Sequence, residues 1–125
     1  MDTVSPNIFV TDLQNTIEFY KKLDFQVITT VPDESGIPIF AMMINGTVTF
    51  MFQTFKSVDG LLPLISRNAG GSLLLYIKMK DIRSYFENIK DKVPVVSGLE
   101  RTFYGATEFS VIDPNNFMLT FAEDE

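Results

Sequence analysis

The chain of 125 residues contains no cysteine and no histidine. Without cysteine it can form neither disulfides nor thiolate metal sites, and it has no cysteine nucleophile. Without histidine it lacks the commonest general base near neutral pH and the commonest transition-metal ligand. Any metal would therefore need oxygen ligands, and acid–base chemistry would fall to carboxylates, tyrosine or lysine.

Long apolar runs and an excess of basic residues are also missing. No stretch approaches the roughly 20 apolar residues that span a bilayer, and the N-terminus has neither the basic region nor the apolar core of a signal peptide. We therefore expect a cytoplasmic protein without a membrane partner. The net charge of −6 disfavours nucleic acid, because phosphates attract a basic surface, whereas it suits a cationic ligand.

The composition that is present indicates a folded globule. Hydrophobic residues make up 46% of the chain and aromatic residues 13%, enough to build a core rather than a disordered segment. The length corresponds to one domain. Residues 55–71 form the longest irregular stretch, with an apolar patch at Leu61-Leu62-Pro63-Leu64-Ile65, and they mark the one internal boundary.

Apolar and polar positions alternate along several stretches, which is the period of a strand with one buried face. The pattern predicts strands at 4–10, 25–31, 39–44, 47–53, 72–79 and 93–103. A hairpin is expected at 104–123, turning at Asp113-Pro114-Asn115-Asn116. A second hairpin is expected at Asn45-Gly46, the strongest short turn signal in the chain.

Two helices are predicted, each after an aspartate. Asp12 and Asp81 are expected N-caps, because a carboxylate there accepts hydrogen bonds from backbone N–H groups of the first turn. Apolar residues follow both aspartates at the same offsets: Leu13, Ile17 and Tyr20 after the first, and Ile82, Phe86 and Ile89 after the second. Each half thus reads strand, helix, strand, strand, strand, which predicts a duplicated unit. The alternative is an α+β domain with ordinary local signals.

The strands of both halves also share a mixed second face. Opposite the apolar face expected to pack on a helix, this second face combines small polar groups with large side chains such as Phe9, Met51 and Tyr76. A solvated sheet face would not carry so many large apolar groups. If the sheet curves, the mixed face forms a trough with the composition of a ligand pocket.

The chain resembles the vicinal oxygen chelate superfamily, which includes glyoxalase I, extradiol dioxygenases and bleomycin-resistance proteins. The segments that carry the resemblance are Phe9-Val10-Thr11-Asp12-Leu13, Phe19-Tyr20, Leu23-Asp24-Phe25, and Tyr104-Gly105 through Asp113-Pro114 to Phe121-Ala122-Glu123. Asn116 stands where the family usually has glycine. The resemblance implies an α+β fold of two tandem βαβββ modules, each a U-shaped mixed sheet with its helix on the outer face. It places module 1 at about 1–55, the linker at 56–71 and module 2 at about 72–125 of a single domain, 1–125. It also implies a barrel closed across a dimer.

The resemblance further implies where a metal would bind. Metal-dependent members carry histidine or glutamate at four positions, which match Ser5, Thr49, Leu74 and Thr120 here. None of these is a ligand for a catalytic divalent metal, since hydroxyls are weak donors and leucine is none. We therefore expect no metal and no cofactor, as in the metal-free branch, whose members sequester bleomycin-like drugs in a dimer cleft and confer antibiotic resistance.

The first hypothesis is a small-molecule binding protein that takes a cationic or aromatic drug or metabolite and acts as a homodimer. No catalytic residue is assigned. The expected ligand-binding residues are Ser5, Asn7, Thr49, Met51, Gln53, Tyr76, Phe103, Tyr104 and Thr120. One alternative is a metal-independent lyase or isomerase, with Glu108 or Tyr76 as acid or base. Another is a ligand-sensing interaction domain that docks through the patch at 61–65.

Overall fold

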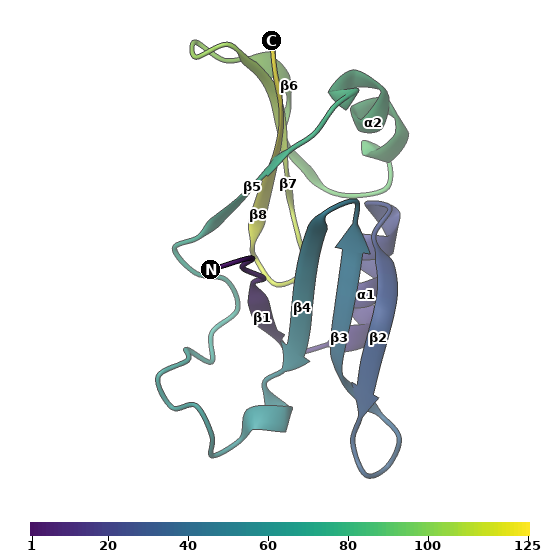
Figure 1. Ribbon diagram of the computed structural model, residues 1–125, viewed down its shortest axis with the longest axis vertical. Helices are drawn as coiled ribbons and strands as arrows, with labels where there is room; N and C mark the ends of the chain where they lie inside the picture. The colour runs from purple at the N-terminus through teal and green to yellow at the C-terminus, as the bar shows by residue number, and fades with distance from the viewer. The chain divides into compact units, whose positions relative to one another are not determined.

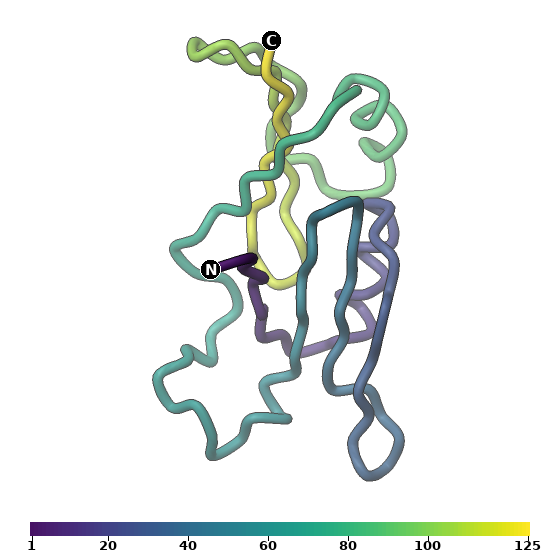
Figure 2. The backbone as a smooth tube through the Cα atoms, in the orientation of Figure 1, coloured from purple at the N-terminus to yellow at the C-terminus, as the bar shows by residue number.

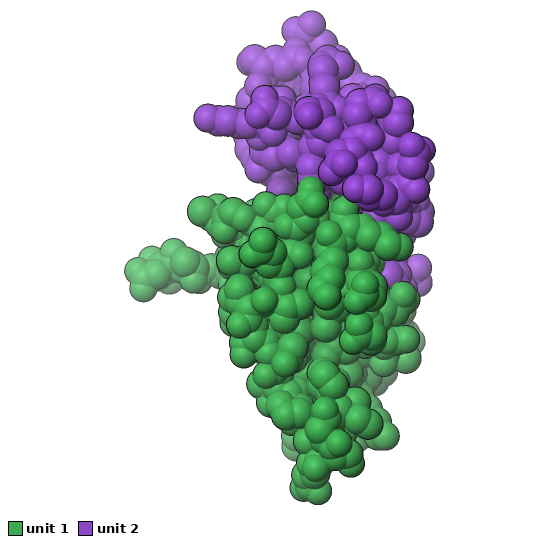
Figure 3. Space-filling view, turned by 90° about the vertical axis from the view of Figure 1, so that its right-hand side faces the viewer, with its two compact units in different colours: residues 1–69 green, residues 70–125 purple.

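The computed structural model describes residues 1–125 (Figure 1). The chain divides into two compact units, residues 1–69 and 70–125, which are coloured separately in Figure 3 and are described one at a time. The expectation that these two units form a single domain stays a prediction. Neither helix is long and apolar enough to cross a bilayer.

Unit 1 is a four-stranded mixed sheet with one helix packed on it. Strand β1 pairs in parallel with β4, and β4, β3 and β2 follow in antiparallel order, so the sheet reads β1-β4-β3-β2. Helix α1 lies behind the sheet in Figure 1. The elements are β1 (Asn7–Val10), α1 (Leu13–Lys22), β2 (Gln26–Pro32), β3 (Pro38–Asn45), β4 (Val48–Thr54) and the 3-10 turn η1 (Lys56–Val58).

Unit 2 repeats this topology. Strand β5 pairs in parallel with β8, and the sheet order is β5-β8-β7-β6. The elements are β5 (Leu74–Lys78), α2 (Ile82–Ile89), β6 (Val95–Arg101), β7 (Ala106–Ile112) and β8 (Met118–Asp124). The predicted α+β class with two tandem βαβββ modules is confirmed.

Aromatic side chains fill the core of each unit between its helix and its sheet. In unit 1, Tyr20 of α1 is fully buried, and its ring lies 4.8 Å from that of Phe52 and 5.6 Å from that of Phe50. In unit 2, Phe109 and Phe121 stack with centroids 5.0 Å apart. Such rings contribute both large buried area and specific ring–ring geometry, so they fix which face of each sheet receives the helix.

Two predicted strands begin later than expected. Strand β1 starts at Asn7 rather than at residue 4, and Val4 is 92% exposed. Pro6 has no N–H to donate to a ladder, although its carbonyl accepts from Met51 N at 2.9 Å. Strand β5 is limited to Leu74–Lys78 instead of residues 72–79.

Two interruptions also differ from what the sequence predicts. Ser97 and Gly98 lie within the predicted strand 93–103, where a serine-glycine pair is expected to break it, yet β6 runs unbroken from Val95 to Arg101 with shifts in its register to β7 on both sides of Ser97. These shifts are bulges, which add residues to one strand without ending it. The turn between β3 and β4 lies one position later than predicted: Asn45 pairs with Val48, and Gly46, with φ +59, is the first of two turn residues.

The two helices are capped differently, contrary to the prediction from the repeat. The carboxylate of Asp12 accepts from Asn15 N at 3.0 Å, as expected. Asp81 makes no side-chain cap and has φ 58 and ψ 41, in the left-handed region. The carboxylate of Glu123 instead accepts from Asp81 N at 3.0 Å and Ile82 N at 3.2 Å. A residue of β8 therefore satisfies the first free N–H groups of α2.

The predicted turn at 113–116 is present, and its closest equivalent is the β2–β3 turn. Oδ1 of Asp113 accepts from Asn115 N and Phe117 N, both at 2.8 Å, and Oδ1 of Asp33 accepts from the corresponding amides of its own turn. Asn116, with φ 64, occupies the left-handed position that Gly36 holds in the other turn. Asparagine tolerates this conformation better than most residues.

The irregular segment after β4 is organised by one arginine. The guanidinium of Arg67 donates to the carbonyls of Val58, Leu61, Leu62 and Ile65, at 3.2, 2.5, 3.3 and 3.0 Å. Figure 2 shows this stretch as a winding path beyond η1. The leucines of the predicted patch at 61–65 are exposed.

Candidate functional site

Each sheet has one face covered by the helix of its unit and a second face that this helix does not cover, here called the open face. Alternation of side chains assigns the residues to each face. On the open face of unit 2 the pairing brings Tyr76, Thr120 and Ser110 into one row across β5, β8 and β7. The next row holds Lys78, Ala122, Glu108 and Glu100 across all four strands.

Two residues of this open face and one of the adjoining turn form a hydrogen-bonded cluster, here called the Glu108 cluster. The phenol oxygens of Tyr76 and Tyr104 each donate to Oε2 of Glu108 at 2.5 Å. Tyr76 comes from β5 and Glu108 from β7, whereas Tyr104 belongs to the β6–β7 turn, which is completed by Gly105 with φ +84. The two phenols thus converge on one carboxylate oxygen from separate elements.

The charge of the carboxylate changes the titration of both phenols. The hydrogen bond to Glu108 is the largest of the effects that raise the pKa of Tyr76 above its usual value, with desolvation and the negative charge of Glu108 acting in the same direction. The same hydrogen bond raises the pKa of Tyr104. Both phenols are therefore protonated donors at neutral pH, because ionising either would place a second negative charge beside the carboxylate.

Thr120 and Phe103, two further residues predicted to bind ligand, lie in contrasting surroundings. Thr120 is only 5% exposed, and its hydroxyl is 2.8 Å from that of Ser110, so the two hydroxyls satisfy each other. Phe103 is 99% exposed. Its ring meets that of Tyr104 edge-on at 5.0 Å, at the rim of the Glu108 cluster.

The predicted site residues of unit 1 gather on the open face of that unit, with one exception. Nδ2 of Asn7 donates to Oε1 of Gln53 at 3.1 Å, and Gln53 donates to the Ser57 hydroxyl at 3.2 Å. Met51 is the register partner of Asn7, and Thr49 precedes it by two positions on the same strand face. Ser5 is the exception, since it lies before β1 and in no strand.

The four positions implied for a metal do not provide a metal site. Thr120 is bonded to Ser110, Leu74 has no donor atom, and Ser5 lies outside the sheet. No group of three or more aspartate or glutamate residues is placed to hold an ion. The donor set at these positions therefore does not fit the catalytic divalent metals of the family.

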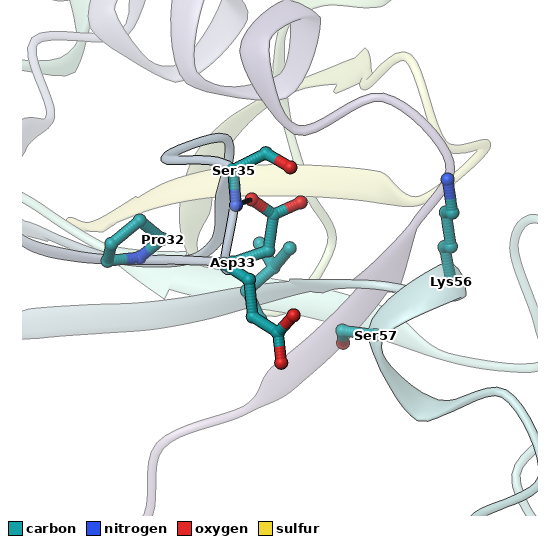
Figure 4. A pocket seen from close by; sticks show the side chains of 7 residues that line it. Pro32, Asp33, Ser35, Lys56 and Ser57 are labelled. Carbon is teal, nitrogen blue, oxygen red and sulfur yellow. Dashed lines mark hydrogen bonds between the residues drawn. The ribbon is translucent and has the colours of Figure 1, made fainter.

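Unit 1 also contains a hollow of about 700 Å³ that none of the predicted site residues lines. Figure 4 shows Asp33 and Ser35 of the β2–β3 turn on one side and Lys56 and Ser57 on the other. The Asp33 carboxylate is already used within its turn. The hollow thus takes its shape mainly from this hydrogen-bonded turn and from η1.

Comparison with known proteins identifies the family. The model of the Glyoxalase/Bleomycin resistance protein/Dioxygenase superfamily matches residues 2–121. The chain belongs to this superfamily. The resemblance inferred from the sequence motifs is thereby confirmed. Comparison with curated proteins gives no match.

Several solved structures share the fold over the whole chain. A protein of unknown function from Agrobacterium tumefaciens is 25% identical, with 100% of this chain and 95% of that chain covered and a TM-score of 0.77. A bleomycin resistance determinant encoded on transposon Tn5 is 21% identical, with 100% and 99% covered and a TM-score of 0.68. A bleomycin-binding protein complexed with bleomycin is 20% identical, with both chains fully covered and a TM-score of 0.65.

Glu108 was considered from the sequence only as an acid or base, and its two tyrosine partners were missed. Tyr76 and Tyr104 were predicted as ligand residues independently of it. The sequence feature that could have placed it is the alternation of side chains along the strand: Phe109 is buried under the helix, so its neighbour Glu108 must lie on the open face. Which side chains of β5 reach it depends on the β5-β8-β7 register, which the sequence pattern alone does not fix.

Proposed function

We propose that this member of the superfamily binds a small organic molecule, aromatic or cationic, on its open sheet faces, without a metal and without chemical change. The observation that carries the proposal is the make-up of these faces. On unit 1, Phe9, Met42 and Met51 are half-buried beside Asn7 and Gln53. Large apolar groups interspersed with a few orienting amides and hydroxyls are characteristic of ligand pockets.

A second copy of the chain is proposed to complete the site. On unit 2, Leu74, Tyr76 and Met118 of the open face are 45%, 44% and 36% exposed. Apolar surface of this kind favours association, and a homodimer would cover it while leaving a cleft for the ligand. The bleomycin-binding relative supports sequestration of a drug-like molecule as the biological role, in which the protein acts in the cytoplasm and confers antibiotic resistance.

The absence of metal ligands supports binding rather than metal-assisted chemistry. The superfamily positions that would hold the ion carry Ser5, Thr49, Leu74 and Thr120, which are poor or impossible ligands. Elemental analysis of protein purified without chelator is expected to find no stoichiometric transition metal. One zinc or nickel ion per chain would refute this part of the proposal.

A thermal-shift panel tests ligand binding itself. Bleomycin and flat cationic aromatic compounds are compared with neutral metabolites, and the hits are confirmed by titration calorimetry. A ligand present at 100 times its Kd stabilises the folded chain by about 2.7 kcal/mol, a shift that is easily measured. Recovery of the ligand unchanged by mass spectrometry is expected, and a converted product would point to an enzyme instead. A stable monomer on size-exclusion chromatography would remove the shared cleft.

A further inference from the structure

The carboxylate of Glu108 has no compensating positive charge. No lysine or arginine forms an ion pair with it, and Lys78, the nearest cation in its row, is bound to Asp124 at 2.8 Å. Its cross-strand partner on β6 is another carboxylate, Glu100. Like charges directly opposite each other on a sheet are destabilising. A positive charge supplied from outside would relieve this repulsion.

The hydrogen bonds leave Glu108 ready to accept one more donor. Tyr76 and Tyr104 both donate to Oε2, and Oε1 receives no hydrogen bond from the protein. The two phenols restrict the rotation of the carboxylate, so that Oε1 is held in a defined position. An N⁺–H donor on this oxygen would make a charge-assisted hydrogen bond, about twice as strong as a neutral one.

The surroundings suit an organic cation better than a metal ion. The rings of Tyr76 and Tyr104 adjoin the carboxylate, and an ammonium group within about 6 Å of such a ring is attracted by its π-face. A metal ion would need several more oxygen ligands, and no group of three or more carboxylates is available. Ala122, the register partner of Glu108 on β8, is fully buried, whereas Tyr76 and Tyr104 are 44% and 56% exposed, so a ligand would reach the cluster from the side of the two rings.

We propose that the Glu108 cluster is the recognition point for an ammonium group on an aromatic ligand, with Oε1 of Glu108 as acceptor and the rings of Tyr76 and Tyr104 as its walls. This inference rests on the proposed ligand-binding function and specifies the class of ligand. Phe103, which adjoins Tyr104 at the rim, is positioned to extend the aromatic wall toward the flat part of the ligand.

The test uses two probes that differ only in charge. 1-Naphthylmethylammonium and 1-naphthylmethanol have the same ring and nearly the same size, and both are titrated by fluorescence against the full-length protein at neutral pH. The wild type is expected to bind the cation more tightly than the alcohol. Glu108→Gln keeps the shape and one acceptor but removes the charge, and it is expected to weaken cation binding about tenfold, as for loss of a charge-assisted hydrogen bond.

Matched variants separate a local effect from net charge. Glu18→Gln removes the same charge from the exposed face of α1 and is expected to leave both affinities within about twofold. Tyr76→Phe and Tyr104→Phe keep the rings but remove the hydrogen bonds that hold the carboxylate. Each variant is expected to bind the cation more weakly and to bind the alcohol with unchanged affinity. Circular dichroism verifies that every variant is folded.

The outcomes distinguish the two proposals. Equal affinity for both probes, or cation binding that Glu108→Gln leaves unchanged, overturns the ammonium assignment while ligand binding stands. An equal loss in Glu18→Gln and Glu108→Gln also overturns it, since general electrostatic attraction would then suffice. If the wild type binds neither probe, the open face of unit 2 is not a ligand site, and both proposals fail there.

Discussion

The different capping of the two helices gives a prediction that opposes the sequence repeat. If the halves were equivalent, substitutions at Asp12 and Asp81 would have the same effect on stability. In the structure Asp12 caps α1 at 3.0 Å, whereas Asp81 makes no cap and has φ 58. Asp12→Ala should therefore destabilise the chain by about 1 kcal/mol, whereas Asp81→Gly should stabilise it.

The size of each effect follows from the local geometry. A left-handed backbone costs an ordinary L-residue about 1–2 kcal/mol, and aspartate somewhat less, so Asp81→Gly should gain about 0.5 kcal/mol after the larger entropy of glycine in the unfolded chain is included. Glu123→Ala removes the acceptor of two amides, at 3.0 and 3.2 Å. Its cost should be about 1–2 kcal/mol, because both amides are at the helix N-terminus and the acceptor is charged.

Urea denaturation followed by circular dichroism measures these differences. The urea midpoint of Asp81→Gly should lie above that of the wild type, and the midpoint of Asp12→Ala below it. The midpoint of Glu123→Ala should be equal to or lower than that of Asp12→Ala, while the slope m stays unchanged in all variants. In thermal melts 1 kcal/mol corresponds to about 4 °C for a chain of this size. A loss of 1 kcal/mol or more in Asp81→Gly, or an unchanged midpoint in Glu123→Ala, would refute the assignment of the cap to β8.

Three further predictions concern the Glu108 cluster, a turn and the irregular segment. The pKa values of Tyr76 and Tyr104 are raised in the folded chain. Their contribution to stability is therefore complete below a pH of about 10, the unfolded tyrosine value, and is lost as the pH rises through the folded values. Ultraviolet titration should show these phenols ionising at lower pH in Glu108→Gln, and identical curves would contradict the hydrogen bonds. Asn116→Gly should raise the free energy of unfolding in urea by up to about 0.5 kcal/mol, since φ is 64 there, and a decrease would show that the asparagine side chain is needed. Arg67→Met should accelerate thermolysin cleavage within residues 58–67 with little change in Tm, because the guanidinium binds four carbonyls of that segment. The control variant Lys56→Met should leave the cleavage rate unchanged.

The sequence predicted the parts of the fold that depend on local periodicity. Leu13, Ile17 and Tyr20 repeat at helical spacing, and Phe50 and Phe52 alternate with residues of the mixed face; all five are buried. Such patterns report which face each element buries without reference to any partner. The duplication followed because the same patterns occur twice in the same order, and the family motifs extended the inference to topology.

Features that depend on distant partners were missed. The cap of α2 comes from Glu123, 42 residues after Asp81, and no local pattern distinguishes Asp81 from Asp12. The Glu108 cluster likewise joins residues 32 positions apart, Tyr76 and Glu108, through the strand register. Thr120 was selected for its face, yet its hydroxyl lies buried against Ser110, a pairing visible only once β7 and β8 are aligned.

The parallel pairing of the first and last strand within each unit bears on how the protein folds during synthesis. Every strand partner of β1 to β4 lies between Asn7 and Thr54, so the first sheet has all its hydrogen-bonding partners before any strand of the second has been translated. Chains are made at about 5–20 residues per second, far slower than hairpins close. The nascent first half can therefore complete its own ladder on the ribosome without exposing an unpaired central strand.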